Sequence, residues 1–208
     1  MIASVLRLTR ADIKALKVKD SYSIHRVVYD LFDDVRSDVE KRQGKESGIL
    51  FVDKGGDFHQ RQILMLSNRL PRQAEYGEVD SRPIPDDFLD HDHYRFELVV
   101  NPVKRESASR KLVPVKGREA VAEWFAEKAE NRLGFRVDRP SLQVNHLSVH
   151  HFEKKGQLVT LGSATLQGQL TVYDRAQFIL SFQQGIGRGK AFGFGLLQIV
   201  PTQNPFQI

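Results

Sequence analysis

The chain has 208 residues, which is enough for one or two domains, and its 40% hydrophobic and 27% charged residues are typical of a globular protein that buries a core. It contains no cysteine, which excludes disulfides, thiol catalysis and cysteine-based metal sites. It shows neither a secretory signal nor a run near the roughly 18 apolar residues of a membrane span, so we expect a cytoplasmic protein that binds no membrane. The formal net charge is +5, with 16 Lys and Arg against 18 Asp and Glu in residues 1–103 but 15 against 8 in residues 104–208, which is compatible with a polyanion-binding surface in the second half without requiring one.

The first two predicted elements are a strand and an amphipathic helix. Apolar residues dominate positions 2–8, which predicts a strand. Residues 20–23 then offer candidate N-caps. After them, apolar side chains recur for three turns at the spacing of one helix face. The helix is therefore expected to bury Ile24, Val27, Val28, Leu31, Phe32 and Val35.

The rest of the first half is predicted to complete one α+β unit. Short apolar runs at 48–52 and 62–66 flank a glycine-containing turn and indicate a hairpin. Residues 67–92 are rich in turn residues, with room for one short helix, and 94–100 read as a further strand. The resulting order, β-α-β-β-(α)-β, is that of a split βαβ or ferredoxin-like unit.

The second half repeats this organisation loosely. Pro114 confines the strand that contains it to a sheet edge. The predicted elements are an edge strand at 111–115, a helix that ends near Gly134, two long strands at 142–152 and 157–173, a short helix capped by Asp174, and a last strand at 194–200. We therefore predict an α+β fold with two tandem ferredoxin-like domains of RRM type, residues 1–103 and 104–208.

A glycine-rich segment follows the last predicted helix. Residues 185–195 contain five glycines, with Arg188 and Lys190 among them, and such a loop can expose backbone N–H groups to a phosphate. A Walker loop is excluded because Gln184 and Ala191 occupy its first glycine and its hydroxyl positions. A dinucleotide fingerprint is excluded because Lys190 stands at its last glycine position. A phosphate-binding loop and a turn that merely permits tight packing both remain open.

Three segments together resemble one protein family. The glycine-rich segment resembles the loop of the RAMP superfamily of CRISPR-associated proteins. Tyr22-Ser-Ile-His-Arg opens the first helix, and Phe96-Glu-Leu-Val-Val-Asn-Pro-Val-Lys ends the first half. In this order and at these separations, the segments are similar to the CasE family, the endoribonucleases of the type I-E Cascade complex that mature CRISPR RNA. The resemblance covers essentially the whole chain and implies tandem domains of the RAMP type.

The resemblance also implies a substrate and partners. The expected substrate is the repeat hairpin of precursor CRISPR RNA, cut at the 3′ base of its stem. The enzyme would then stay bound to the stem and join the other Cascade subunits, beside the backbone subunit next to the 3′ handle of the CRISPR RNA, so its turnover would be low. Neither a cofactor nor a metal is expected.

His25 is the candidate catalytic residue. Metal-free RNA cleavage needs the 2′-hydroxyl to lose a proton and attack the phosphate in line while the 5′-oxygen gains one, leaving 5′-hydroxyl and 2′,3′-cyclic phosphate ends. One imidazole can serve either step, and the sequence leaves both roles open. His25 borders the apolar helix face, where it can also be a purely structural residue. The resemblance assigns catalysis to His25 and an assisting role to Tyr22, whereas the lysine of some relatives is replaced by Asp30.

Basic residues are expected to form the RNA-binding surface. Each of them can also be an ordinary solvated charge, and Arg26 can pair with Asp30 four residues on. The pair at the tip of the long predicted hairpin, Lys154 and Lys155, is the candidate for insertion into an RNA groove. The predicted RNA-binding set is Arg26, Lys104, Arg105, Arg110, Lys111, Lys154, Lys155, Gly185, Gly187, Arg188, Gly189 and Lys190.

The remaining histidines and aromatics carry weaker signals. His91 and His93 have short metal-ligand spacing but no obvious further ligands, and His150 and His151 should point to opposite faces of a strand. Phe192 and Phe194 are read as core rather than as base-stacking platforms. Two other functions stay open: a non-catalytic RAMP-type RNA-binding subunit of a CRISPR surveillance complex, and an unrelated small-molecule enzyme of ferredoxin-like fold.

Overall fold

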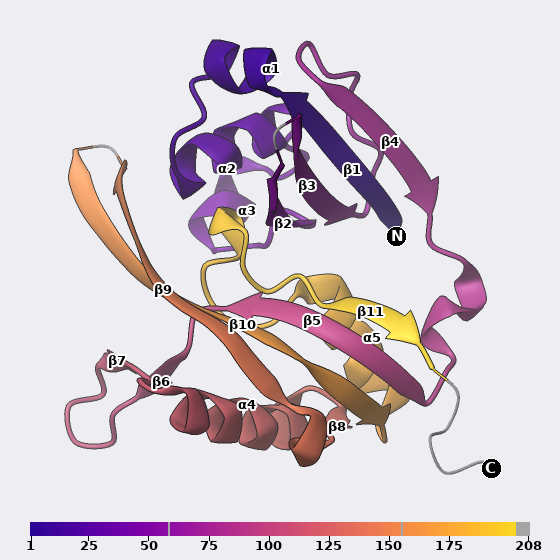
Figure 1. Ribbon diagram of the computed structural model, residues 1–208, viewed down its shortest axis with the longest axis vertical. Helices are drawn as coiled ribbons and strands as arrows, with labels where there is room; N and C mark the ends of the chain where they lie inside the picture. The colour runs from indigo at the N-terminus through magenta and orange to yellow at the C-terminus, as the bar shows by residue number, and fades with distance from the viewer. Residues whose placement is uncertain (58, 155, 203–208) are drawn as a thin grey trace.

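The computed structural model describes residues 1–57, 59–154 and 156–202. Within them lie two large antiparallel sheets, one above the other in Figure 1, and a small two-stranded one. The first sheet has the order β2-β3-β1-β4, and all of its pairs are antiparallel. Read from the other edge, this is the 4-1-3-2 order of a ferredoxin-like unit. Its strands are β1 (Ile2–Thr9), β2 (Ile49–Gly56), β3 (Gln60–Ser67) and β4 (Glu78–Pro83).

Helix α2 (Ser21–Asp30) supports this sheet and carries the predicted N-terminal signal. The Asp20 side chain accepts a hydrogen bond from the backbone N–H of Ser23, which pairs one of the free donors of the first turn. The helix ends at Asp30, and Val35, which was expected on its buried face, is exposed. Two further short helices, α1 (Arg10–Ala15) and α3 (Asp38–Arg42), precede and follow it.

The second sheet begins earlier in the chain than predicted. The strand expected at 94–100 is β5 (His93–Val100), and it pairs with β10 (Gln157–Val172) and β11 (Gln198–Pro201), not with the first sheet. The fourth strand of the first sheet is β4, which the sequence analysis missed because its alternation of charged and partly buried residues lacks an apolar signal. The sheets therefore divide the chain between β4 and β5, ahead of the boundary expected at residue 103.

With β5 as its first strand, the second unit repeats the topology of the first. Its main path is β11-β5-β10-β8, again a 4-1-3-2 order, and this confirms the predicted tandem ferredoxin-like fold. Helices α4 (Arg118–Arg132) and α5 (Arg175–Gln184) connect its strands, and β8 spans Phe135–Val137. The added segments are the ribbon of β6 (Val103–Arg105) and β7 (Leu112–Pro114), β9 (Gln143–Lys154), and three 3₁₀ turns, η1 (Asp86–Leu89), η2 (Arg139–Ser141) and η3 (Lys190–Phe192).

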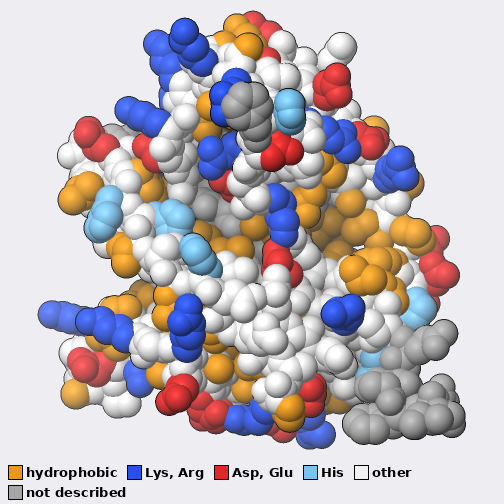
Figure 2. Space-filling model, in the orientation of Figure 1, with side chains coloured by type: hydrophobic (Ala, Val, Ile, Leu, Met, Phe, Trp, Pro, Cys, Tyr) orange, Lys and Arg blue, Asp and Glu red, His pale blue; other side chains and the backbone are white. Residues whose placement is uncertain are grey.

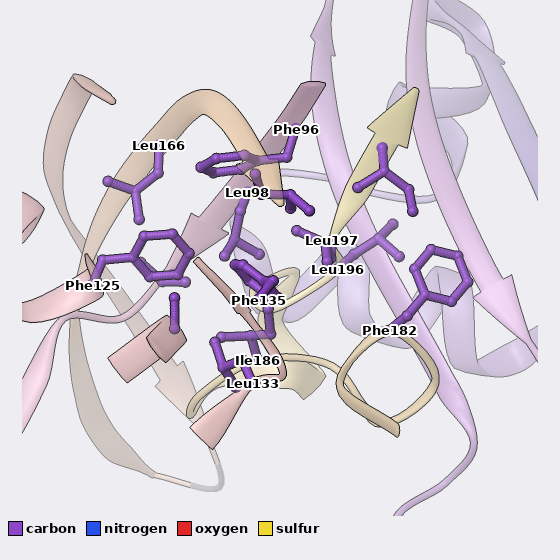
Figure 3. Close-up of a cluster of buried hydrophobic side chains, with 14 of the residues drawn as sticks. Phe96, Leu98, Phe125, Leu133, Phe135, Leu166, Phe182, Ile186, Leu196 and Leu197 are labelled. Atoms are coloured by element: carbon purple, nitrogen blue, oxygen red, sulfur yellow. The ribbon is translucent and has the colours of Figure 1, made fainter. Parts of the chain in front are cut away.

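The two units share their core. Residues 49–52 of β2 are all buried because the first sheet is covered on both faces. Ile49 and Phe51 face α2, whereas Leu50 and Val52 belong to the large cluster that also fills the second unit. Figure 3 shows part of this cluster, with Phe125 and Phe182 among its labelled members. Lys54 of β2 also forms an ion pair with Glu97 of β5. The units are therefore packed against each other, and a site at their junction has a defined geometry. None of the helices within the described residues is long and apolar enough to cross a membrane.

Candidate active site

His25 lies at the junction of the two units. It belongs to the first helical turns of α2, which contact both β9 and η3 of the glycine-rich segment. Its half-buried ring lies with its centroid 4.2 Å from that of Tyr29 and 5.8 Å from that of Phe192. The core residues Ile24 and Val28 hold the helix on its sheet, so the position of the imidazole is set by packing.

Aromatic rings from three elements surround the imidazole. Tyr22 is stacked on His25 with ring centroids 5.9 Å apart and an interplanar angle of 15°, so the two rings lie on one side of the helix as their spacing predicts. Tyr22 also stacks on Phe152 of β9 at 6.3 Å, and Phe152 contacts Phe192 at 4.7 Å. Phe192 was read as a core residue, but it lies half-buried in this cluster.

The surroundings of His25 favour its neutral form. Burial lowers the pKa of the imidazole below its ordinary value of 6.5; the backbone of Ala191 opposes this shift and the positive charge of Lys154 adds to it. Its Nδ1 atom is buried and has no hydrogen-bond partner. Unpaired buried polar atoms are rare in folded proteins and call for a functional explanation. Burial therefore favours the neutral form of the ring over the charged form.

A second histidine joins the two units behind the candidate site. The ring of His150 on β9 hydrogen bonds through Nε2 to Ser163 Oγ at 2.9 Å and through Nδ1 to Ser21 Oγ at 3.3 Å. It also packs edge-on against Phe194, with ring centroids 5.6 Å apart. Burial is the main cause that lowers the pKa of His150. The neighbouring His151 is exposed on the opposite face, as the strand alternation predicts.

Two of the predicted RNA-binding cations lie at the candidate site. The Arg26 guanidinium carbon is 5.8 Å from the centroid of the Tyr22 ring, and the Lys154 ammonium group is 5.4 Å from that of Phe192. Arg26 forms no ion pair with Asp30, which pairs with Arg72 instead. Lys155 lies outside the described residues.

The other predicted cations are divided between the glycine-rich segment and the ribbon. Lys190 pairs with Glu46 of the first unit, while Arg188 is exposed and forms no ion pair with the described residues. The ribbon β6–β7 and its loop carry four cations that likewise pair with none of the described carboxylates. None of the four is among the residues found in contact with His25. These four residues are Lys104, Arg105, Arg110 and Lys111.

Packing explains much of the glycine-rich segment. Gly185 has φ +76°, and a Cβ there would lie 2.6 Å from a methyl group of Leu50; at Gly189 a Cβ would meet the Phe194 ring at the same distance. At Gly187, by contrast, the nearest atom to such a Cβ is the Lys128 ammonium nitrogen at 3.9 Å. Gly185 and Gly189 therefore permit close packing, and Gly187 is the more open glycine of the three.

Within the described residues, no group of three or more His, Asp or Glu side chains is arranged to hold a metal ion. The pair that the sequence analysis considered is occupied with other contacts. His91 packs edge-on against Tyr94, and His93 Nδ1 is 3.1 Å from the hydroxyl of Thr171.

Comparison with known proteins identifies the family. A family model described as CRISPR associated protein matches residues 1–201. CRISPR-associated endoribonuclease Cse3 of Thermus thermophilus is 32% identical over 117 residues, which cover 51% of this chain and 55% of that relative. The chain thus matches about half the length of this curated relative.

Two solved structures show the same fold over nearly the whole chain. The CRISPR endoribonuclease Cse3 bound to a 19 nt RNA has a TM-score of 0.78 at 24% identity, with 97% of this chain and 100% of that chain covered. A chain of a CRISPR RNA-guided surveillance complex has a TM-score of 0.67 at 16% identity, with 97% and 100% covered. Together with the family model, which spans both units, these findings lead to one conclusion. The chain belongs to the CRISPR associated protein family.

Proposed function

We propose that the protein is a metal-independent endoribonuclease that cleaves the repeat hairpins of precursor CRISPR RNA at the 3′ base of the stem. The observation that carries the proposal is the imidazole of His25, half-buried beside Tyr22 and the glycine-rich segment, with an unpaired Nδ1 and a lowered pKa. The similarity to an endoribonuclease and to an RNA-bound relative supports RNA as the substrate.

The lowered pKa of His25 favours the role of general base. In this mechanism the imidazole takes the proton of the 2′-hydroxyl, and the 2′-oxygen forms a bond to the adjacent phosphorus. The bond from phosphorus to the 5′-oxygen breaks, and the 5′-oxygen gains a proton from solvent or from the protonated ring. The products are a 2′,3′-cyclic phosphate and a 5′-hydroxyl. The hydroxyl of Tyr22 helps to orient the scissile group.

Positive charge around the imidazole suits the transition state, in which negative charge builds on the phosphate oxygens. Lys154 and Arg26 flank the aromatic cluster, and His25 lies in the first two turns of α2, near the partial positive charge of the helix N-terminus. These groups come from both units, so the scissile phosphate is expected to lie across the junction between them.

After cleavage the enzyme is proposed to stay on the stem and to join Cascade, next to the backbone subunit at the 3′ handle of the CRISPR RNA. A chain of the same fold occurs in a CRISPR RNA-guided surveillance complex, which supports this step. Low turnover would follow from it, because the product would keep the contacts made by the substrate stem.

The test is cleavage of a stem-loop repeat RNA by the purified protein in the presence of EDTA. We expect one cut at the 3′ base of the stem, with 5′-hydroxyl and 2′,3′-cyclic phosphate ends. A matched RNA with one 2′-deoxy sugar immediately upstream of the cut should be bound but not cleaved. Cleavage of the deoxy substrate, or activity only after a divalent metal is added, would contradict the mechanism. Binding without any cleavage would favour a non-catalytic RNA-binding subunit.

A further inference from the structure

An open groove of about 640 Å³ lies beside the candidate site. One wall is the ribbon β6–β7 with the residues that follow it, the other wall is the hairpin β9–β10, and Arg188 of the glycine-rich segment also lines the groove. In Figure 2 basic side chains project at the edge of the molecule where the ribbon lies, beside exposed hydrophobic side chains. The proposed mechanism uses none of the residues that line this groove.

The groove combines exposed apolar surface with positive charge. Leu112, Leu147 and Val149 line it and are 42%, 40% and 59% exposed, although residues of these types are usually buried. Lys116 and Arg188 also line it, and its lining contains no carboxylate. The ribbon adds four further cations that pair with no described acid. Such a surface fits a ligand that is flat and apolar in one part and anionic in another.

The groove shares lining residues with a small cavity beside the candidate site. Ser148 and Ser163 line both the groove and a small cavity of about 180 Å³ whose other walls include Ser21 and Phe192. Phe192 contacts the His25 ring. Ser148 is four residues from Phe152 on β9, which corresponds to roughly 13 Å along an extended strand. A polynucleotide whose scissile phosphate lies at His25 can therefore reach the groove with its neighbouring nucleotides.

We propose that this groove binds the single-stranded ribonucleotides that flank the repeat stem. The inference rests on the proposed function and adds to it a subsite outside the stem. Unpaired bases expose their faces and edges, which can lie against Leu147, Val149 and the guanidinium plane of Arg188, whereas bases inside a stem are stacked on each other. The phosphates of the same segment are neutralised by Lys116 and by the cations of the ribbon.

The test compares three RNAs at one fixed salt concentration: the stem-loop alone, the stem-loop with its 5′ single-stranded flank, and the stem-loop with its 3′ flank. Affinity is measured for uncleavable RNAs with the 2′-deoxy sugar at the cut. For the natural protein we expect one flank to tighten binding about tenfold, which is within the range for one stacked base. The two flanked RNAs show which side of the stem enters the groove.

The double variant Leu147→Ser/Val149→Ser should lose most of the gain from the flank and keep its affinity for the stem-loop alone. Leu180→Ser on α5, whose side chain is 44% exposed, is the matched control and should keep the full gain. Arg188→Lys keeps the positive charge but removes the planar guanidinium group, so it should reduce the affinity gained from the flank only in part. Thermal unfolding of each variant checks that the fold is intact.

Equal affinity of all three RNAs would overturn the inference, as would an equal loss of the gain in the control variant. In the case of equal affinities, cleavage of the stem-loop would leave the proposed function standing, and the groove would be free for a protein partner. Failure to bind or cleave the stem-loop at all would instead reject the proposed function. A gain that depends on Leu147 and Val149 supports the subsite.

Discussion

The two ferredoxin-like units share one strand order, but they contribute to the candidate site in different ways. In the first unit His25 lies on α2, the helix that connects the first and second strands and is held by the core beneath it. In the second unit the contributing residues lie on two segments added to the basic topology, the extended strand β9 and the glycine-rich segment, and the added ribbon β6–β7 carries further unpaired cations. A packed helix suits a residue that must be positioned for chemistry, whereas projecting segments suit a large polyanion.

This comparison implies that catalysis and RNA binding are separable by mutation. Residues of α2 should control the rate at which bound RNA is cut. Residues of the added segments should control how tightly, and at what salt concentration, RNA is held. The comparison fails if both sets of variants change the same quantity.

The largest effect is expected for His25→Ala. Removal of a positioned general base or acid should lower the single-turnover cleavage rate by about 10²–10⁴-fold, while the affinity for stem-loop RNA stays near that of the natural protein. His151→Ala is the matched control, because His151 is exposed on the opposite face of β9, and it should cut at the natural rate. Full activity of His25→Ala would reject the assignment of this residue.

The glycine-rich segment offers a way to separate the effect of close packing from that of backbone strain. Gly195 has φ +86°, and a Cβ there would lie 2.7 Å from the carbonyl oxygen of Ile186, so Gly195→Ala should lower the free energy of unfolding by about 3 kcal/mol. Gly187 has the same φ but open surroundings, so Gly187→Ala should cost only about 1 kcal/mol. Chemical denaturation measures both values. Equal losses would show that backbone strain alone, and not close packing, explains these glycines.

The two half-buried histidines, His25 and His150, predict a pH dependence of stability. Burial lowers the pKa of His25 and of His150 in the folded protein, so between the folded and unfolded pKa values the unfolded chain binds more protons. The free energy of unfolding should therefore decrease as the pH falls below about 6.5, the ordinary value, and the loss should be complete below the folded pKa. The double variant His25→Ala/His150→Asn should show a shallower slope between pH 7 and pH 5. An unchanged slope would contradict the stated cause.

The smallest effect is expected for Lys154→Gln, which tests the electrostatic interaction between the two units. Lys154 of β9 lowers the pKa of His25 on α2, so Lys154→Gln should raise that pKa. If neutral His25 is the base, cleavage falls as the pH drops through its pKa, and the midpoint of this fall should move to a higher pH in Lys154→Gln. The salt dependence of binding should also weaken by about one unit of log–log slope, because one phosphate contact is lost. An unchanged midpoint would show that the charge of Lys154 does not influence the pKa of His25.

Local sequence signals predicted the parts of the molecule that depend on near neighbours. Asp20 caps α2, the spacing of Tyr22 and His25 places both rings on one side of the helix, and 49–56 and 60–67 form the expected hairpin. The end of α2 was predicted too late because Val35 continues the apolar spacing although the chain has already left the helix. The spacing of apolar residues alone does not show where a helix ends.

Only the tertiary structure decided which strands pair and which distant residues meet. The pattern of β5 is that of a buried strand, and either sheet could have accepted it, because strand pairing depends on partners far along the chain. The contact of His25 with Phe192, the bonds of His150 to Ser21 and Ser163, and the apolar groove beside the ribbon each join residues separated by more than ten positions. The sequence by itself thus determined the helix that carries the imidazole and the residue types of its expected chemistry. The packing of one unit on the other determined how deeply that imidazole is buried, and this burial lowers its pKa.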